Sequence, residues 1–298
     1  MTGNEVQQIS RRAFLKNGTL VLAATASLDS SLLLADKPVS KKTRVGIVTD
    51  LHYADKSAAG SRHYRESPEK LNVAALQFAQ QKPDFIVELG DFIDAADSVQ
   101  TEIAYLKRIN KDFITICKQR HYVLGNHCVY TLKKQEFLDV VEQKKSYYSF
   151  DSGNFHFIVL DSCFRSDGQA YGRKNFEWTD PNIPTEELEW LQADLNATQK
   201  KTVIFAHQRL DVSNHYGVKN CLKVRSILEQ SEKVLAVFQG HSHQNDHNEI
   251  NGIHYCTMVA MVEGSGDANN AFSIMEIANN GTIKIEGFKK QADYLWKK

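Results

Sequence analysis

Five short motifs place metal-binding side chains directly after apolar segments of this 298-residue chain. They are Asp50-Leu51-His52, Gly90-Asp91, Gly125-Asn126-His127, Ala206-His207 and Gly240-His241-Ser242-His243. Each motif alone is weak, because Gly-Asp and Gly-Asn are ordinary turn dipeptides and a single histidine at a strand end is more often structural. Together, the mixed nitrogen and oxygen donors suit Mn, Fe, Zn or Ni better than Mg or Ca alone. The combination predicts a metal centre.

The segments before these motifs predict the strands that position them. Apolar runs over 43–49, 84–89 and 121–124 alternate with helical patterns over 68–81 and 96–118, which favours α/β structure with parallel strands. Strands over 202–206 and 234–238 precede the last two motifs. Because ligands bind at the C-terminal ends of strands in such sheets, five segments distant in sequence can converge on one site.

The rest of the chain is richer in strands. A hairpin is predicted from 147–150 and 154–160, and Asn279-Asn280-Gly281 predicts a turn between strands 271–277 and 282–288. Strand 253–259 is expected to join these last two in closing the chain as antiparallel strands. Helices are predicted over 135–143, 185–196 and 222–230. No repeat or linker divides the chain, so residues 36–298 are predicted to form one domain.

The order of the five motifs resembles the calcineurin-like metallophosphoesterase family. Its pattern is Asp-x-His, Gly-Asp-x-x-Asp, Gly-Asn-His, His and Gly-His-x-His, and all five blocks occur here between Arg44 and Met258. The resemblance implies a four-layer α/β/β/α sandwich, in which two mixed sheets pack face to face between helices. It also implies a hydrolase that acts on small phosphate esters.

The resemblance further implies a role for each ligand. Asp50, His52 and His243 would hold one metal, and Asn126, His207 and His241 the other, with Asp91 bridging the two. Two cations about 3.5–4 Å apart clamp a phosphoryl oxygen and generate a hydroxide for in-line attack. Asn126 would also contact the substrate.

By the same resemblance, His127 is the histidine that contacts the substrate without binding metal. It would stabilise the phosphoryl charge and protonate the leaving oxygen as a general acid; the alternative is a residue that only packs. The family usually places Asp or Glu directly after this histidine, whereas this chain has Cys128. Asp94 could supply the missing negative charge, or it could cap a helix near Ala95.

A loop after the first motif is the main indication of substrate. Tyr53-Ala54-Asp55-Lys56 is followed by Arg62-His63-Tyr64-Arg65-Glu66, in which Arg62 and Arg65 could grip phosphate and Tyr64 could stack a base. An ordinary solvated loop is equally compatible. This block resembles the branch of manganese-dependent ADP-ribose/CDP-alcohol diphosphatases, although that branch commonly has Gln at the position of His52. The resemblance favours phosphodiester or pyrophosphate substrates.

Other interpretations stay open at this stage. A phosphomonoesterase would use the same centre, and a non-catalytic metal-binding scaffold could keep the same fold. Asp211, Asn214, His215 and Tyr216 follow His207 and could shape the leaving-group side, or could form an ordinary loop.

Composition and the N-terminal sequence indicate which partners and which location to expect. Lys plus Arg and Asp plus Glu both number 36, so no overall charge would draw a nucleic acid polymer. The five cysteines are dispersed and predict buried thiols. The run Ser10-Arg11-Arg12-Ala13-Phe14-Leu15-Lys16 precedes an apolar stretch too short for a stable membrane span, and resembles a twin-arginine signal over 1–35. The alternative is a flexible N-terminal tail with a chance Arg-Arg pair. The predicted partner is the translocation machinery, and the predicted location periplasmic or secreted.

Overall fold

The computed structural model describes residues 13–16, 19–22 and 42–297. The pattern of contacts divides the chain into two units, Met1–Val39 and Ser40–Lys298. In the first unit, β1 (Ala13–Lys16) and β2 (Thr19–Leu22) form an antiparallel pair. The predicted export signal over 1–35 lies mostly outside the described residues, so it stays a prediction.

Two six-stranded mixed sheets make up the second unit. The first has the order β14-β13-β12-β3-β4-β5, formed by β3 (Thr43–Val48), β4 (Phe85–Glu88), β5 (Arg120–Tyr122), β12 (Ala271–Ile277), β13 (Ile283–Lys289) and β14 (Tyr294–Trp296). The second has the order β10-β11-β9-β8-β7-β6, formed by β6 (Tyr148–Ser152), β7 (Phe155–Val159), β8 (Lys201–Phe205), β9 (Val234–Gln239), β10 (Asp246–Ile250) and β11 (Ile253–Thr257). β3, β4 and β5 are parallel, as are β7, β8, β9 and β11.

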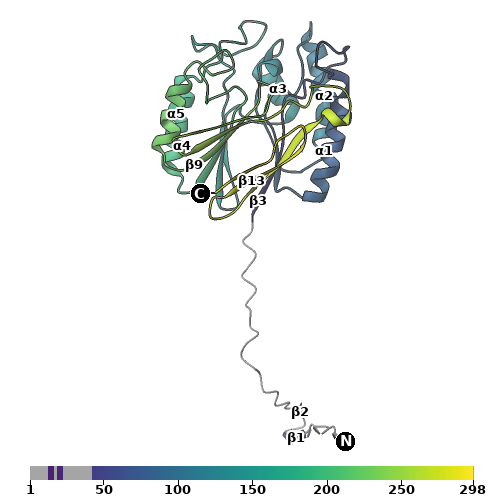
Figure 1. Cartoon of the computed structure of the whole chain (residues 1–298), viewed down its shortest axis with the longest axis vertical. Coiled ribbons are helices and arrows are strands. Elements are labelled where there is room, and N and C mark those ends of the chain that lie inside the picture. Colours follow the sequence, from purple (N-terminus) through teal and green to yellow (C-terminus); the bar gives the residue numbers. More distant parts are fainter. Residues whose placement is uncertain (1–12, 17–18, 23–41, 298) are drawn as a thin grey trace, which may run out of the picture. The chain divides into compact units, whose positions relative to one another are not determined.

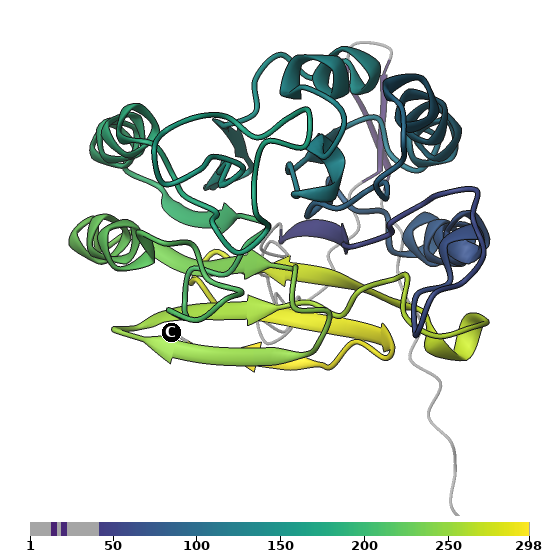
Figure 2. The ribbon, with the colours of Figure 1, turned by 90° about the horizontal axis from the view of Figure 1, so that it is seen from above.

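Helices cover the outer faces of both sheets (Figure 1, Figure 2). The first sheet packs against α1 (Ser67–Gln81), α2 (Val99–Phe113) and α3 (Lys134–Val141). The second packs against α4 (Thr185–Ala197) and α5 (Cys221–Gln230). A third apolar cluster lies between the two sheets. The predicted four-layer α/β/β/α sandwich is therefore confirmed.

Burial on both faces explains why the parallel strands are apolar at nearly every position. In β4, Phe85 and Val87 face the second sheet, whereas Ile86 faces the helices on the other side. β8 alternates in the same way, with Ile204 directed toward α4 and α5. Strands covered on both faces show such continuous apolar runs. The interiors of β4 and β9 are therefore apolar, and metal-binding motifs begin just after these strands end.

The differences from the predicted elements have local causes. The helix predicted over 96–118 begins only at Val99, because the side chain of Ser98 caps it by accepting a hydrogen bond from Thr101 N. The prediction that 253–259 closes the chain among antiparallel strands is wrong in part, since β11 joins the second sheet parallel to β9. β10 and β14 were not predicted, because these short edge strands lack a clear apolar run.

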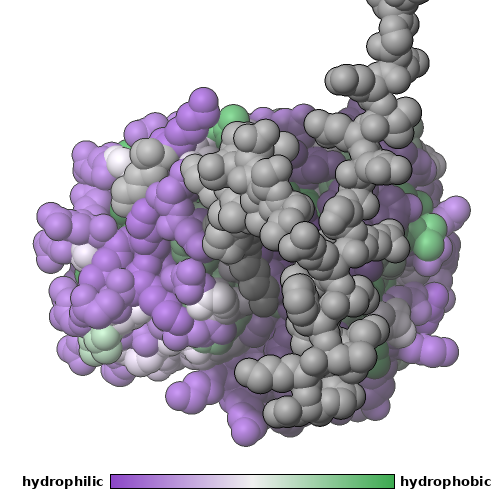
Figure 3. All heavy atoms as spheres, turned by 90° about the horizontal axis from the view of Figure 1, so that it is seen from below, coloured by the Kyte–Doolittle hydropathy of each residue, from purple (hydrophilic) through white to green (hydrophobic). Residues whose placement is uncertain are grey.

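Surface and thiols agree with an ordinary globular domain. The face seen in Figure 3 is largely hydrophilic, with isolated hydrophobic residues. All five cysteines are free thiols and four of them are buried, as predicted. Among the described residues, no helix is both long and apolar enough to cross a bilayer.

Candidate active site

The C-terminal ends of parallel strands bring the metal-binding motifs together. In chain order, Asp50 and His52 follow β3, Asp91 follows β4, Asn126 and His127 follow β5, His207 follows β8, and His241 and His243 follow β9. Three groups of these side chains have ligand atoms close enough to share an ion, namely Asp50/His52/His243, His52/Asp91/His127 and Asp91/His207/His241. Both sheets therefore contribute to one centre.

The backbone turns sharply at the ligand residues. The φ angles of Asp50, His52, Asp91, His241 and His243 are 50°, 44°, 56°, 70° and 63°. A left-handed backbone at a residue with a Cβ costs on the order of 1 kcal/mol or more, and persists where the surrounding structure enforces it. Such strain gathers at functional sites, and here it turns the side chains toward one another at the strand ends.

Two glycines of the motifs leave room for the ligands. A Cβ at Gly90, whose φ is +104°, would overlap the imidazole of His207. A Cβ at Gly125 would overlap the carboxylate of Asp91. The glycines of Gly-Asp and Gly-Asn are therefore required by the close approach of ligands from neighbouring strands.

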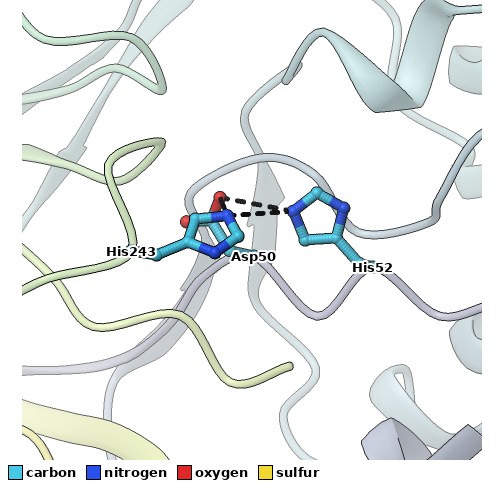
Figure 4. Close-up of side chains that lie close together, drawn as sticks. All are labelled: Asp50, His52 and His243. Carbon is cyan, nitrogen blue, oxygen red and sulfur yellow. Dashed lines mark hydrogen bonds and ion pairs between the residues drawn. The ribbon is translucent and has the colours of Figure 1, made fainter. Parts of the chain in front are cut away.

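Asp50, His52 and His243 form the first cluster (Figure 4). Asp50 Oδ1 lies 3.3 Å from His243 Nε2 and 3.7 Å from His52 Nε2, and the two Nε2 atoms are 3.2 Å apart. The other ring nitrogen of each histidine is held by a carboxylate. His243 Nδ1 lies 2.6 Å from Glu263 Oε1, and His52 Nδ1 lies 3.0 Å from Asp94 Oδ1. These contacts fix the rings with Nε2 toward the centre, as is usual for metal ligands.

Asp91 joins this cluster to the second one. Its Oδ2 lies 3.1 Å from His207 Nε2 and 3.5 Å from His52 Nε2, so one oxygen stands between the two clusters. His207 directs Nδ1 to a backbone carbonyl at 2.8 Å, which leaves Nε2 for a metal. His241 completes the second cluster, and Asn126 lines the same pocket.

Two buried atoms at the centre test whether this set fits a pair of metals. Asp50 Oδ1 and His241 Nε2 have no hydrogen-bond partner among the described residues. Buried polar atoms are nearly always partnered, so an unpartnered oxygen and nitrogen in adjacent clusters indicate missing ligands. Two metal ions would satisfy both atoms. When bound, such a pair polarises a phosphoryl oxygen and lowers the pKa of a bound water.

Burial shifts the pKa values of the ligands, and for Asp50 and His243 the charges of neighbouring ligands shift them in the opposite direction. Burial raises the pKa of Asp50, but His207 and His243 outweigh this effect and hold its pKa well below the usual range. Burial lowers the pKa of His243, but Asp50 and Glu263 raise it to about 9. For His241, burial and the neighbouring His207 lower the pKa to about 3. Asp50 is therefore ionised and His241 neutral near neutral pH, which are the forms that bind cations, whereas His243 would give up a proton when a cation binds.

His127 lies at the edge of this centre with 26% of its side chain exposed. Its Nδ1 is 2.6 Å from Asp94 Oδ1, and its backbone N donates to Asp91 Oδ1 at 2.8 Å. Burial raises the pKa of Asp94, but His127 and His52 outweigh it and hold this pKa well below the usual range. Asp94 is therefore an ionised carboxylate that orients His127. It caps no helix, because α2 begins four residues beyond Ala95.

Cys128 is directed away from His127, into the core. The side chain is fully buried, and its Sγ accepts a hydrogen bond from Phe92 N at 3.4 Å. Burial raises the pKa of the thiol well above its usual value. A carboxylate at this position would be desolvated in the same core, and in this chain Asp94 pairs with His127 instead.

A pocket of about 340 Å³ opens over the two clusters. It is lined by Arg62, Asp91, Asn126, His127, Trp178, Tyr216, His241 and His243. The structure therefore brings Arg62 to the site but not Tyr64 or Arg65. Tyr64 is only 6% exposed and packs in a small apolar cluster, and Arg65 pairs with Asp55 at 2.6 Å outside the pocket. The predicted base-stacking role of Tyr64 therefore has no support in this geometry.

Sequence reasoning missed two residues of the site and left a third, Tyr216, undecided. Trp178 lies in the long loop between β7 and α4, where no motif marks it. Glu263, which holds His243, lies in a loop before β12 that carried no metal-binding pattern. Tyr216 belongs to the polar run after His207, but its residue type alone did not separate it from an ordinary loop residue.

This fold and site define a dinuclear-metal hydrolase of phosphoric esters, in which both sheets supply ligands and one carboxylate stands between two clusters. A sequence model described as calcineurin-like phosphoesterase matches residues 43–245, and the chain belongs to that family. The predicted family and the predicted class of enzyme are confirmed.

Several known proteins are similar to this chain. The manganese-dependent ADP-ribose/CDP-alcohol diphosphatase of Xenopus laevis is 24% identical over 304 residues, which cover 78% of this chain and 84% of that protein. The protein of the same name from Arabidopsis thaliana is 23% identical and covers 73% and 86%. The crystal structure of a dimetal phosphatase from Danio rerio superposes with a TM-score of 0.75 at 20% identity, covering 85% and 98%.

The fold also occurs in a protein with a different description. The Plasmodium protein GAP50, described as the anchor in the inner membrane complex, superposes with a TM-score of 0.58 at 16% identity and covers 86% of this chain and 90% of that one. This likeness shows the fold alone, and the conclusion about catalysis rests on the family and the candidate ligand set.

Proposed function

We propose that this chain hydrolyses the pyrophosphate bond of small molecules in which a nucleoside 5′-phosphate is joined to a second phosphate ester. ADP-ribose and CDP-alcohols are examples, and Mn²⁺ is the proposed metal. The similarity to two diphosphatases named for these substrates and for manganese supports both parts.

The position of Arg62 is the observation that carries the proposal. It lines the pocket beside the two clusters, and its only ion pair among the described residues is a 3.9 Å contact with Asp94. A diphosphate has one phosphoryl group for the metals and a second for a guanidinium, which binds phosphate oxygens in pairs. A phosphomonoester would leave this arginine without a phosphate.

A substrate panel combined with elemental analysis tests the proposal. The purified protein should contain two transition-metal ions per chain, and Mn²⁺ should give the highest activity after metal removal and reloading. The kcat/KM for ADP-ribose should exceed that for p-nitrophenyl phosphate by about tenfold or more, with bis(p-nitrophenyl) phosphate between them. Preference for p-nitrophenyl phosphate would instead support a phosphomonoesterase. A folded protein that hydrolyses none of these esters would support the non-catalytic scaffold.

We also propose that the chain is exported through the twin-arginine route. The support is the Arg11-Arg12 pair, followed by Phe14, Leu15 and an apolar stretch. That route carries folded proteins, which suits an enzyme loaded with metal before export. In a bacterial host, Arg11→Lys combined with Arg12→Lys should keep the protein in the cytoplasmic fraction. Unchanged export of this variant would contradict the proposal.

A further inference from the structure

Two aromatic side chains form one wall of the pocket, beside His241. The ring centroids of Trp178 and Tyr216 lie 5.6 Å and 5.9 Å from that of His241, and 6.0 Å from each other. Trp178 is 42% exposed. Large aromatic surface left open at a polar pocket adds little to folding, and commonly marks a ligand contact.

The loop that carries Trp178 is held in place by packing and charge. Tyr171 is buried, and its ring stacks on Phe176 with centroids 3.7 Å apart. Arg173 pairs with Glu136 at 2.5 Å and donates to a backbone carbonyl of the neighbouring loop at 2.6 Å. Trp178 lies directly after this anchored stretch, so the backbone that carries its exposed ring is held in place.

Tyr216 is presented by a second anchored loop. Arg209 N donates to Tyr216 O at 3.2 Å, and Val218 N donates to Arg209 O at 2.9 Å. The Arg209 guanidinium is nearly buried and lies 2.6 Å from both Asp211 and Asp246. These contacts fix the backbone on both sides of Tyr216. Asp211 therefore has a structural role here, whereas Tyr216 lines the pocket.

Besides the two aromatic rings, the pocket is lined by side chains that can bind phosphate. Arg62 and His127 also line it, and the metal-binding clusters lie at its base. A ligand that fits this pocket has an anionic part for the metals and Arg62, and a flat aromatic part for Trp178 and Tyr216. Base–aromatic stacking tolerates any base, because every base has a π-face.

We propose that Trp178 and Tyr216 stack the nucleobase of the substrate, and so make this enzyme select nucleoside-linked diphosphates over diphosphates without a base. This inference rests on the proposed function, since it assigns the base-binding part of that same pocket. It replaces Tyr64, which the sequence suggested for this role and which lies outside the pocket. Trp178 and Tyr216 then determine specificity without taking part in bond cleavage.

The selectivity of the enzyme between two diphosphates tests whether Trp178 and Tyr216 stack the nucleobase. The substrates are ADP-ribose and a P1,P2-dialkyl diphosphate, and the readout is the ratio of their kcat/KM values. Trp178→Leu should lower this ratio about tenfold through the KM for ADP-ribose, whereas Trp178→Phe should keep most of it. Leu222→Ala removes an exposed apolar side chain on α5, outside the pocket, and should leave the ratio unchanged. An unchanged ratio in Trp178→Leu would overturn the inference.

A binding measurement separates this inference from the proposed function. Besides Trp178, the chain has only Trp190, which is half-buried, and Trp296, which is 7% exposed. AMP should therefore quench tryptophan fluorescence of the wild-type protein but not of Trp178→Phe, and ribose 5-phosphate should quench neither. Equal quenching by AMP and ribose 5-phosphate would show that Trp178 does not stack the nucleobase, and would overturn the inference. If the enzyme hydrolyses only phosphomonoesters, the proposed function fails; both probes are then substrates, and quenching recorded before turnover still decides the role of Trp178.

Discussion

Asp91→Asn should lower kcat by about a thousandfold or more, and the variant should lose at least one of its two metal ions. The reason is the position of one carboxylate oxygen, which lies between His207 and His52 at 3.1 and 3.5 Å. A carboxylate can serve two cations at once, whereas a neutral amide offers one weak oxygen ligand. Asn keeps the shape of the side chain, and its oxygen can still accept the hydrogen bond from His127 N.

The measurement combines elemental analysis with steady-state kinetics on ADP-ribose. Circular dichroism and thermal unfolding show whether the variant is folded, so that loss of metal is not mistaken for loss of structure. Asp139→Asn makes the same chemical change on the exposed surface of α3, and should behave like the wild type. A folded Asp91→Asn enzyme with full metal content and wild-type kcat would show that Asp91 does not bridge the metals.

The metal ligands could be predicted from sequence because their position depends on a simple rule. Each motif follows an apolar run, and the C-terminal ends of parallel strands meet at one edge of a sheet. The rule brings Asp50 and His52 after β3 close to His207 after β8, and the order of the five motifs, which resembles that of the family, proposes them as ligands. The strained φ angles of His241 and His243 had no counterpart in the sequence, because the convergence of both sheets imposes them.

The role of Asp94, the partner of His127, could not be decided from the sequence. Asp94 was compatible with a helix cap or with a charge for His127, and both uses depend on where the next helix begins. Ser98 caps that helix, which leaves Asp94 for His127. The same limit applies to Trp178, since packing elsewhere in its loop decides where the ring lies. Loop contacts of this kind are set by tertiary structure, and residue spacing does not reveal them.

Each metal cluster takes residues from both sheets. The first combines Asp50 and His52 of the first sheet with His243 of the second, and the second combines Asp91 with His207 and His241. Metal binding therefore links the two sheets across the edge where the pocket opens. Because ligands of the native state stabilise it, ions bound here would hold the two sheets together at the site as well as supply the chemistry.

His127→Gln should make the rate depend steeply on the leaving group. For a phosphodiester that releases ethoxide, kcat should fall about a hundredfold or more, because a positioned acid contributes this much when the leaving oxygen needs a proton. For the matched ester that releases p-nitrophenolate, the loss should be only a few-fold, since this anion departs without a proton. Asp94 holds Nδ1 of His127 at 2.6 Å, so Nε2 is the ring nitrogen left for the substrate.

Asp94→Asn should produce the same pattern with a smaller loss, about tenfold for the ethyl ester, because the imidazole keeps its place but loses its charged partner. Arg65→Gln removes an exposed charge of the neighbouring loop, and should leave both rates unchanged. Brønsted plots over a series of leaving groups measure the effect, with KM followed separately. If His127→Gln slowed all esters equally, His127 would stabilise phosphoryl charge without donating a proton, and Asp94 would orient it for that purpose alone.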